Sequence, residues 1–240
     1  MALAVFPDDW ARALCVVAHP DDLEYGAAGA IAAWTAAGKE VTYLLVTRGE
    51  AGIDAMTPAE TARVREAEER ASAAVVGVDT VEFLEGHVDG VIEYGLALRR
   101  DLAVAIRRHR PEVLVSINHR ESWGGATLNM ADHRHVGLAL LDASRDAGNR
   151  WVFTDTPNDG AAEPWSGARL VAFGGSPQPT HYVDIGAHLE RGIASLREHA
   201  AYIAGLGYDF DPDAFLRGIA RGAGEQVGCE YAATFEVYEF

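Results

Sequence analysis

The chain has 240 residues, of which 49% are hydrophobic and 23% charged, and this length suits one α/β domain with a substantial core. Its 36 acidic side chains outnumber the 20 basic ones and give a formal net charge of −16. A surface of this sign repels nucleic acid and anionic membranes. The composition therefore argues against proteins that bind either, and it favours a folded metabolic enzyme.

The sequence shows no sign of export or membrane insertion. Residues 1–10 lack a basic segment and already contain Asp8 and Asp9, so they are not a signal peptide. The longest apolar runs are far shorter than a bilayer span. Cys15 and Cys229 lie far apart, outside any CxxC pair, which indicates buried thiols rather than a disulfide or a cysteine zinc site. We therefore expect a cytoplasmic protein.

Short apolar runs alternate with helical segments along the first two thirds of the chain. The pattern predicts strands at 13–18, 41–47, 81–84 and 113–117, and helices at 26–37, 58–76, 96–109 and 132–147. Thr57, Pro58 and Glu60 form a capping-box signature before the second of these helices. After Trp151 the pattern loosens into strands at 170–173 and 182–185, a helix at 187–204 and an extended segment at 227–240. This order predicts a Rossmann-like α/β fold, a mostly parallel sheet with helices on both faces.

Three polar clusters follow predicted strands directly. They are His19-Pro20-Asp21-Asp22, Arg48-Gly49-Glu50 and the loop at 118–133. Ligands of open α/β sheets bind at the carboxyl ends of the strands, so we expect these clusters to converge on one edge.

Two adjacent carboxylates distinguish the first cluster. Pro20 restricts the turn, and Asp21 and Asp22 then point in different directions, so one can bind a metal while the other faces a water molecule. The alternative is a helix start with solvated acids, which the helix dipole also favours. The same Pro-Asp-Asp sequence occurs at Pro7-Asp8-Asp9, but there it has no preceding histidine and comes before any predicted strand. We interpret this copy as a solvated turn.

The second part of the predicted site is the sequence NMADHRH. Asn129 or Asp132 can cap the helix that follows, which leaves His133 in its first turn and facing the strand ends. His19, Asp22 and His133 then offer two imidazoles and one carboxylate with an open position, a set that suits catalytic Zn2+. Ferrous iron fits the same ligands. Asp132 suits a supporting role behind the ligands, and without a metal His133 is simply a polar residue at a helix start.

These stretches resemble the LmbE-like, PIG-L-type N-acetylglucosaminyl deacetylase family. The similarity is carried by AHPDDLEYGAAGAI from Ala18, TRGEAG from Thr47 and ADHRHVG from Ala131. It continues through the residues at 65–68 and Gly77-Val78 and, more weakly, through those at 183–185 and 196–199. The resemblance implies a single domain over residues 1–240, with a core at about 13–200 and a C-terminal extension at about 201–240.

The resemblance also assigns roles to residues. It implies zinc on His19, Asp22 and His133, with Asp21 as the general base. Arg65 matches an arginine that family members place in the substrate site.

The chain departs from the family pattern at Met130, where some members carry a histidine that assists the tetrahedral intermediate. Another residue must then supply the proton or contact the oxyanion. His119, His135 and His181 are candidates that the sequence does not rank.

We therefore expect a metal-dependent N-deacetylase, which is a hydrolase that removes an acyl group from a small, sugar-like, N-acylated substrate. We expect this acyl group to be acetyl. Trp123 either stacks on a sugar face or anchors its loop. A non-haem Fe(II) oxygenase uses the same ligand types, although usually with His-x-Asp spacing on a β-rich scaffold. A Rossmann-like binding module without catalysis is the third hypothesis. We expect neither nucleic acid nor membrane as a partner, and the sequence leaves a homo-oligomer open.

Overall fold

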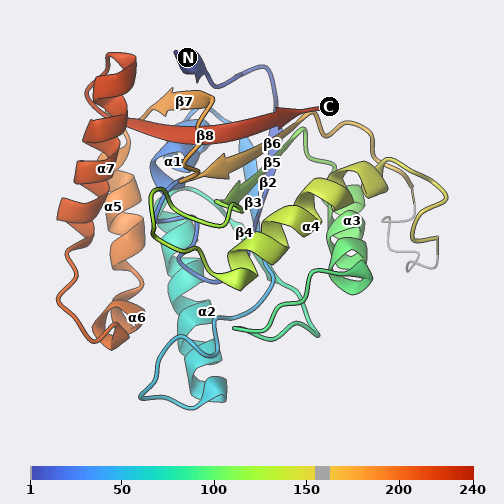
Figure 1. The fold of residues 1–240 in the computed structure, drawn as a ribbon, viewed down its shortest axis with the longest axis horizontal. Helices are drawn as coiled ribbons and strands as arrows, with labels where there is room; N and C mark the ends of the chain where they lie inside the picture. Colours follow the sequence, from blue (N-terminus) through green and yellow to red (C-terminus); the bar gives the residue numbers. More distant parts are fainter. Residues whose placement is uncertain (1, 155–162) are drawn as a thin grey trace.

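A central sheet organises the chain. The computed structural model describes residues 2–154 and 163–240, and in that part of the chain eight strands form one sheet (Figure 1). The strands are β1 (Ala4–Val5), β2 (Arg12–Val17), β3 (Glu40–Leu45), β4 (Thr80–Phe83), β5 (Val113–Ile117), β6 (Leu170–Gly174), β7 (His181–Asp184) and β8 (Ala232–Glu239). Their order is β1-β7-β8-β6-β5-β2-β3-β4. Only β8 runs antiparallel to its neighbours, which confirms the predicted mostly parallel α/β sheet.

Helices cover both faces of the sheet. They are α1 (Ala28–Ala36), α2 (Pro58–Val75), α3 (Leu96–His109), α4 (Ala131–Ala147), α5 (Leu189–Arg197), α6 (Ala200–Gly205) and α7 (Pro212–Val227). Helices α3 and α4 pack on one face, and α1, α2, α5 and α7 contribute to the core on the other (Figure 1).

Strand β2 shows why the central strands are continuous apolar runs. Cys15 and Val17 belong to the core under α1, whereas Leu14 and Val16 belong to the core under α3 and α4. Successive side chains of a strand point to opposite faces, so a strand covered on both sides must be apolar at every position.

The capping signature at the start of α2 is confirmed. The Thr57 hydroxyl accepts the Glu60 N–H, and the Glu60 carboxylate accepts the Thr57 N–H at 3.1 Å. Pro58 occupies the first turn, where its missing N–H costs nothing.

Two predictions for the C-terminal third were wrong. The helix expected at 187–204 is divided into α5 and α6, because the chain turns at His199 and buries this side chain between two glutamates. The segment before the extended end also contains α7, which was not predicted. Its signal was Asp211 before Pro212, since the Asp211 carboxylate accepts the N–H groups of Asp213 and Ala214.

The last strand completes the sheet. β8 lies between β6 and β7, and residues 232–239 pair with both. Of the segment at 227–240 that we expected to be extended, residues 232–239 form strand β8, whereas Val227 is the last residue of α7. This strand joins β7 and β1 to β6 and, through β6, to the parallel strands β5, β2, β3 and β4.

Neither cysteine is paired. Cys15 is buried as expected, whereas Cys229 is partly exposed. Among the described residues, no helix combines the length and apolar character that crossing a bilayer requires.

Candidate metal centre and active-site cavity

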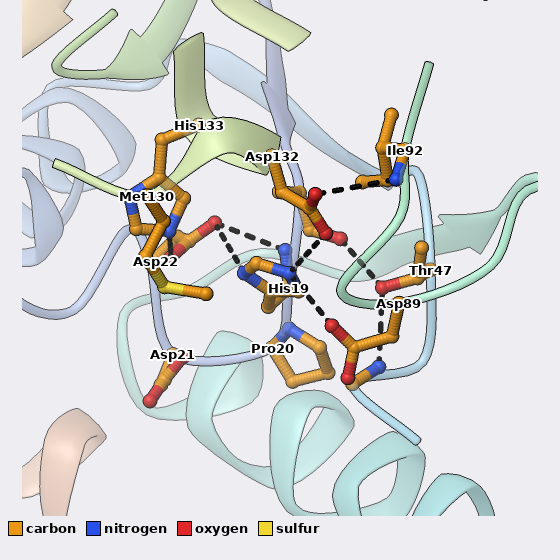
Figure 2. A network of polar contacts seen from close by, with 12 residues as sticks. His19, Pro20, Asp21, Asp22, Thr47, Asp89, Ile92, Met130, Asp132 and His133 are labelled. Atoms are coloured by element: carbon orange, nitrogen blue, oxygen red, sulfur yellow. Dashed lines mark hydrogen bonds and ion pairs between the residues drawn. The ribbon is translucent and has the colours of Figure 1, made fainter. Parts of the chain in front are cut away.

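Two distant segments meet at the carboxyl end of β2. His19 and Asp22 lie in the turn after this strand, and His133 lies in the first turn of α4. One ligand atom from each of the three lies within 4.8 Å of the other two (Figure 2). The position is next to the point where the strand order reverses between β2 and β5, where ligands of such sheets bind. The structure thus brings together the three predicted metal ligands.

The His19 ring is held by carboxylates. Its Nε2 lies 2.9 Å from Asp89 Oδ1 and 3.2 Å from Asp132 Oδ2, which leaves Nδ1 on the side of Asp22, 3.7 Å from Oδ2 (Figure 2). Burial by itself would lower the pKa of His19, but the hydrogen bonds that Asp132, Asp22 and Asp89 accept from it raise the pKa well above its usual value. Such a concentration of negative charge favours a cation.

Asp22 and His133 face each other across a short gap. Asp22 Oδ2 accepts the His19 N–H at 2.9 Å, while Oδ1 lies 3.0 Å from His133 Nε2. His133 Nδ1 contacts Asn129 Oδ1 at 2.9 Å, so the buried Nε2 atom is the one that faces Asp22. A buried imidazole nitrogen this close to a carboxylate oxygen fits a cation held by both groups.

The charge state of Asp22 suits a ligand. Burial would raise its pKa, but the nearby His133 and His19 outweigh this effect and hold the pKa below its usual range. The carboxylate therefore stays ionised, as metal binding requires.

Asp132 contacts a different histidine from the one beside it in sequence. Its carboxylate accepts the N–H groups of Gly90 at 2.7 Å and Ile92 at 3.2 Å, and it contacts His19 rather than His133 (Figure 2). The expectation that Asn129 or Asp132 caps α4 was wrong. The N-cap residue is Met130, which makes no side-chain cap bond.

Asp21 occupies an unusual conformation. Its φ of 91° lies in the left-handed region, which costs a non-glycine residue roughly 1–3 kcal/mol. Oδ1 accepts a hydrogen bond from Arg65 at 3.0 Å, whereas Oδ2 is buried and has no partner. Burial raises the pKa of Asp21 to about 6, against the opposing effect of Arg65. An unpaired carboxylate oxygen with a raised pKa has the properties of a general base near neutral pH.

Arg65 is buried, and both terminal nitrogens of its guanidinium are hydrogen-bonded. Its guanidinium donates to the carbonyls of Gly49 and Pro20 and to the Asp21 carboxylate, and it lies over the Tyr202 ring at 4.1 Å. A side chain on Gly49 would collide with this guanidinium, which explains the glycine in the loop. Arg65 also lines the active-site cavity.

A buried group of charges lies behind Asp21. The Asp21 N–H donates to Glu69 Oε2 at 3.1 Å, and His199 Nε2 lies 3.7 Å from the same oxygen and 3.8 Å from Glu24 Oε2. Burial would lower the pKa of His199, but Glu24 and Glu69 raise it to about 9. These three side chains also have metal-ligand spacing and are buried, and of the three only Glu24 is among the described residues that line the cavity.

A cavity of about 1100 Å³ opens onto the predicted ligands and Asp21. Asp89 and Trp123 also line it, and the Trp123 ring contacts His133 edge-on with 5.8 Å between ring centroids. Trp123 is therefore both a wall of the cavity and a support for its loop. Of the cluster Arg48-Gly49-Glu50, no side chain lines the cavity, and Arg48 pairs with Glu66 and Glu85 instead.

None of the three histidines that could take the place of the residue missing at Met130 is among those lining the cavity. Met130 lines the cavity and lies beside Asp22 and His133 in Figure 2. His119 packs on Phe173, His135 Nδ1 contacts the Ile92 carbonyl and His181 contacts Thr180, and none of them belongs to the cavity lining.

Sequence reasoning missed Asp89, Asn129 as the partner of His133, and Glu69. Asp89 lies in a loop without a preceding motif, so nothing local pointed to it. Glu69 follows Arg65 by four residues, and this spacing places both on one face of α2.

The comparisons with known proteins agree with this geometry. The sequence profile of the PIG-L family, described as GlcNAc-PI de-N-acetylase, matches residues 14–144. A diacetylchitobiose deacetylase from Thermococcus kodakarensis is 28% identical over 233 residues, which is 94% of this chain and 82% of that protein.

Solved structures show the same fold. An N,N'-diacetylchitobiose deacetylase from Pyrococcus horikoshii superposes with a TM-score of 0.85 at 25% identity, covering 96% of this chain and 85% of that one. A conserved protein from Thermus thermophilus gives a TM-score of 0.75 at 27% identity, covering 93% and 92%. The chain therefore belongs to the PIG-L family and is an enzyme of the metal-dependent N-deacetylase class.

Proposed function

We propose that this protein is a zinc-dependent amide hydrolase that removes an acetyl group from the nitrogen of a small, amino-sugar-containing substrate. One observation carries the proposal: His19, Asp22 and His133 converge beside the Asp21 carboxylate, and all four line one cavity. The named deacetylases among the similar proteins act on N-acetylated sugars according to their names, which supports the substrate class.

The metal site and the base have separate tasks in the proposed reaction. His19, Asp22 and His133 hold the ion, which when bound acts as a Lewis acid for the amide carbonyl and acidifies water. Asp21 removes a proton from the attacking water through its unpaired Oδ2 and delivers a proton to the leaving nitrogen. In this scheme Asp21 also serves as the general acid, so the reaction does not need the histidine that some family members carry at the position of Met130.

The neighbouring residues keep these groups in place. Asp132 orients His19, Asn129 orients His133, and Arg65 holds Asp21 while facing the substrate cavity. Partners behind metal ligands typically change metal affinity or activity by about 10- to 100-fold when removed.

Zinc is proposed because two nitrogen donors, one oxygen donor and an open position are a common catalytic zinc set. Ferrous iron is the competing metal, and elemental analysis of protein purified without chelator distinguishes them. Nothing in the geometry favours the oxygenase hypothesis, since the ligands follow His-x-x-Asp spacing on a parallel α/β sheet. We place the reaction in the cytoplasm, in keeping with two free cysteines.

The test is an amine-release assay across a panel of N-acetylated sugars, run with the metal-loaded protein and after chelation. We expect release of acetate and free amine in equal amounts, loss of activity with chelator, and recovery when zinc is restored. Absence of amine release from every N-acetylated sugar, with the metal bound, would refute the proposal.

A further inference from the structure

We propose that the substrate carries an uncharged, apolar alkyl or aryl group on the part that bears the amine, and that an apolar arm of the cavity binds this group. The inference deepens the proposed function and rests on it. We define the apolar arm as the part of the cavity lined by Tyr25, Phe210, Phe215, Leu216, Ile219 and Ala223.

The arm is continuous with the catalytic end of the cavity. Tyr25 follows the turn that carries Asp21 and Asp22, and it contacts both Phe210 and Phe215, with ring centroids 5.9 and 5.7 Å away. Phe210 and Phe215 are themselves 5.4 Å apart. These rings form an unbroken apolar wall from the catalytic turn to α7.

Helix α7 supplies most of the arm. Leu216 and Ala220 are buried in the core, whereas Phe215 and Ile219 are 39% and 52% exposed and line the cavity. Leaving large apolar side chains in contact with water is unfavourable, and a contiguous group of them in a concave wall marks a ligand site. With about 1100 Å³, the cavity is also slightly larger than the range of about 300–1,000 Å³ that is usual for ligand pockets.

The charged residues of the cavity lining argue against a phosphate in the apolar arm. Among the described residues that line the cavity, Arg65 is the only arginine and there is no lysine, and the Arg65 guanidinium donates to Asp21. The same lining contains several acidic residues, Asp89 among them. The six residues that define the arm include no basic side chain to pair with an anionic group, and burying an unpaired charge is costly, so the group bound by the arm is neutral.

The proposed acyl group is acetyl, which is too small to fill the arm. The apolar group therefore belongs to the other product, the amine-bearing part, for which a hydrophobic aglycone of an amino sugar is the simplest chemical form.

The experiment compares the methyl, butyl and hexyl glycosides of N-acetylglucosamine as substrates, each below its micelle concentration. A parallel series keeps the methyl glycoside and lengthens the N-acyl chain. Each methylene moved from water to an apolar lining is worth roughly a fourfold gain in binding. We expect kcat/KM for the hexyl glycoside to exceed that for the methyl glycoside by about tenfold or more, through KM.

A double variant, Phe215→Ser with Ile219→Ser, should bring the hexyl-to-methyl ratio towards one. Leu96→Ser is the matched control, because Leu96 is an exposed aliphatic residue of α3, on the opposite side of the sheet, and this variant should keep the ratio.

The outcomes separate the inference from the function on which it rests. A flat glycoside series with normal metal-dependent amine release overturns the arm and leaves the proposed function intact. If kcat/KM rises with acyl-chain length instead, the arm binds the acyl group, and the proposal that it binds the aglycone is overturned. If no amide is hydrolysed, the function fails, and calorimetric binding of the same glycosides to the wild type and the double variant decides whether the arm binds apolar groups.

Discussion

At the scale of single residues, Asp21 concentrates the chemistry of the site. Its left-handed backbone separates its carboxylate from that of Asp22, so that two adjacent acids differ in pKa: burial raises that of Asp21 to about 6, while that of Asp22 lies below its usual range. Two neighbouring groups whose environments push their pKa values apart are suited to different roles. Here one is suited to bind a cation and the other to exchange a proton.

The substitution Asp21→Asn tests the role of the base. Asparagine tolerates the left-handed conformation and keeps an oxygen acceptor for Arg65, so the fold and the bound metal should be retained. We expect kcat to fall by about 10²- to 10⁴-fold, as measured by amine release with metal content determined on the same sample.

The sequence supplies a matched control for this variant. Asp8 occupies the equivalent place in Pro7-Asp8-Asp9, is exposed as predicted and lies outside the cavity, so Asp8→Asn should leave kcat unchanged. Near-normal turnover of a fully metal-loaded Asp21→Asn protein would show that another group is the base.

At the scale of elements, α2 holds the turn that carries Asp21 in place. Arg65 and Glu69 lie one helical turn apart, and they hold opposite parts of Asp21, the carboxylate and the backbone N–H. His199, at the break between α5 and α6, lies against Glu69 and adds a positive charge behind it. Helix α2 thus holds one strained residue at two points, and His199 supports it through Glu69.

Replacing Glu69 should therefore impair catalysis more than substrate binding. Glu69→Leu removes the acceptor for the Asp21 N–H, and we expect kcat to fall by about 10- to 100-fold with little change in KM. Glu69→Gln keeps an oxygen acceptor and should recover part of the loss. Glu66→Gln, a partly exposed change on the same helix, should leave kcat near the wild-type value. Equal kcat in Glu69→Leu and wild type, with metal bound, would contradict the view that Glu69 positions Asp21 for catalysis.

At the scale of the whole molecule, β8 connects the end of the chain to the active-site loops. Glu236 on this strand accepts hydrogen bonds from Arg120, Ser176 and the Tyr238 hydroxyl. Burial would raise its pKa, but these hydrogen bonds lower it to about 2. Arg120 belongs to the loop after β5 that carries Trp123 towards the cavity, so Glu236 fixes that loop to the sheet.

Glu236→Gln should lower the free energy of unfolding at pH 7 by about 2 kcal/mol, because a charged acceptor of three donors is lost. A carboxyl whose folded pKa is depressed stabilises the protein above its unfolded value of about 4.5, and this contribution disappears as pH falls towards 2. Urea unfolding at pH 7 and pH 3 should show the difference between the variant and the wild type shrinking at the lower pH. Glu239→Gln, an exposed change on β8, should stay within about 0.5 kcal/mol of the wild type at both. A constant difference across this range would show that the charge of Glu236 does not stabilise the fold.

The amino-acid sequence by itself determined the alternation of strands and helices from β2 to α4, although not β1, and it determined the three candidate ligands. Those predictions depend on local signals: apolar period, capping residues at Thr57 and Glu60, and polar residues directly after strands. His19 and Asp22 share one turn, and His133 lies at a recognisable helix start, so their strand-end positions were enough to predict that they meet.

Only the tertiary structure decided which residues support the ligands and what surrounds them. Asp89, Glu69 and His199 contact the site across long sequence separations, and the sequence around them does not show which residues of the site they contact. The pairing of β8 between β6 and β7, and the place of α7 against the cavity, likewise depend on packing between distant segments. Periodicity reports which face of an element is apolar, but the partner that covers this face is fixed only when the chain folds.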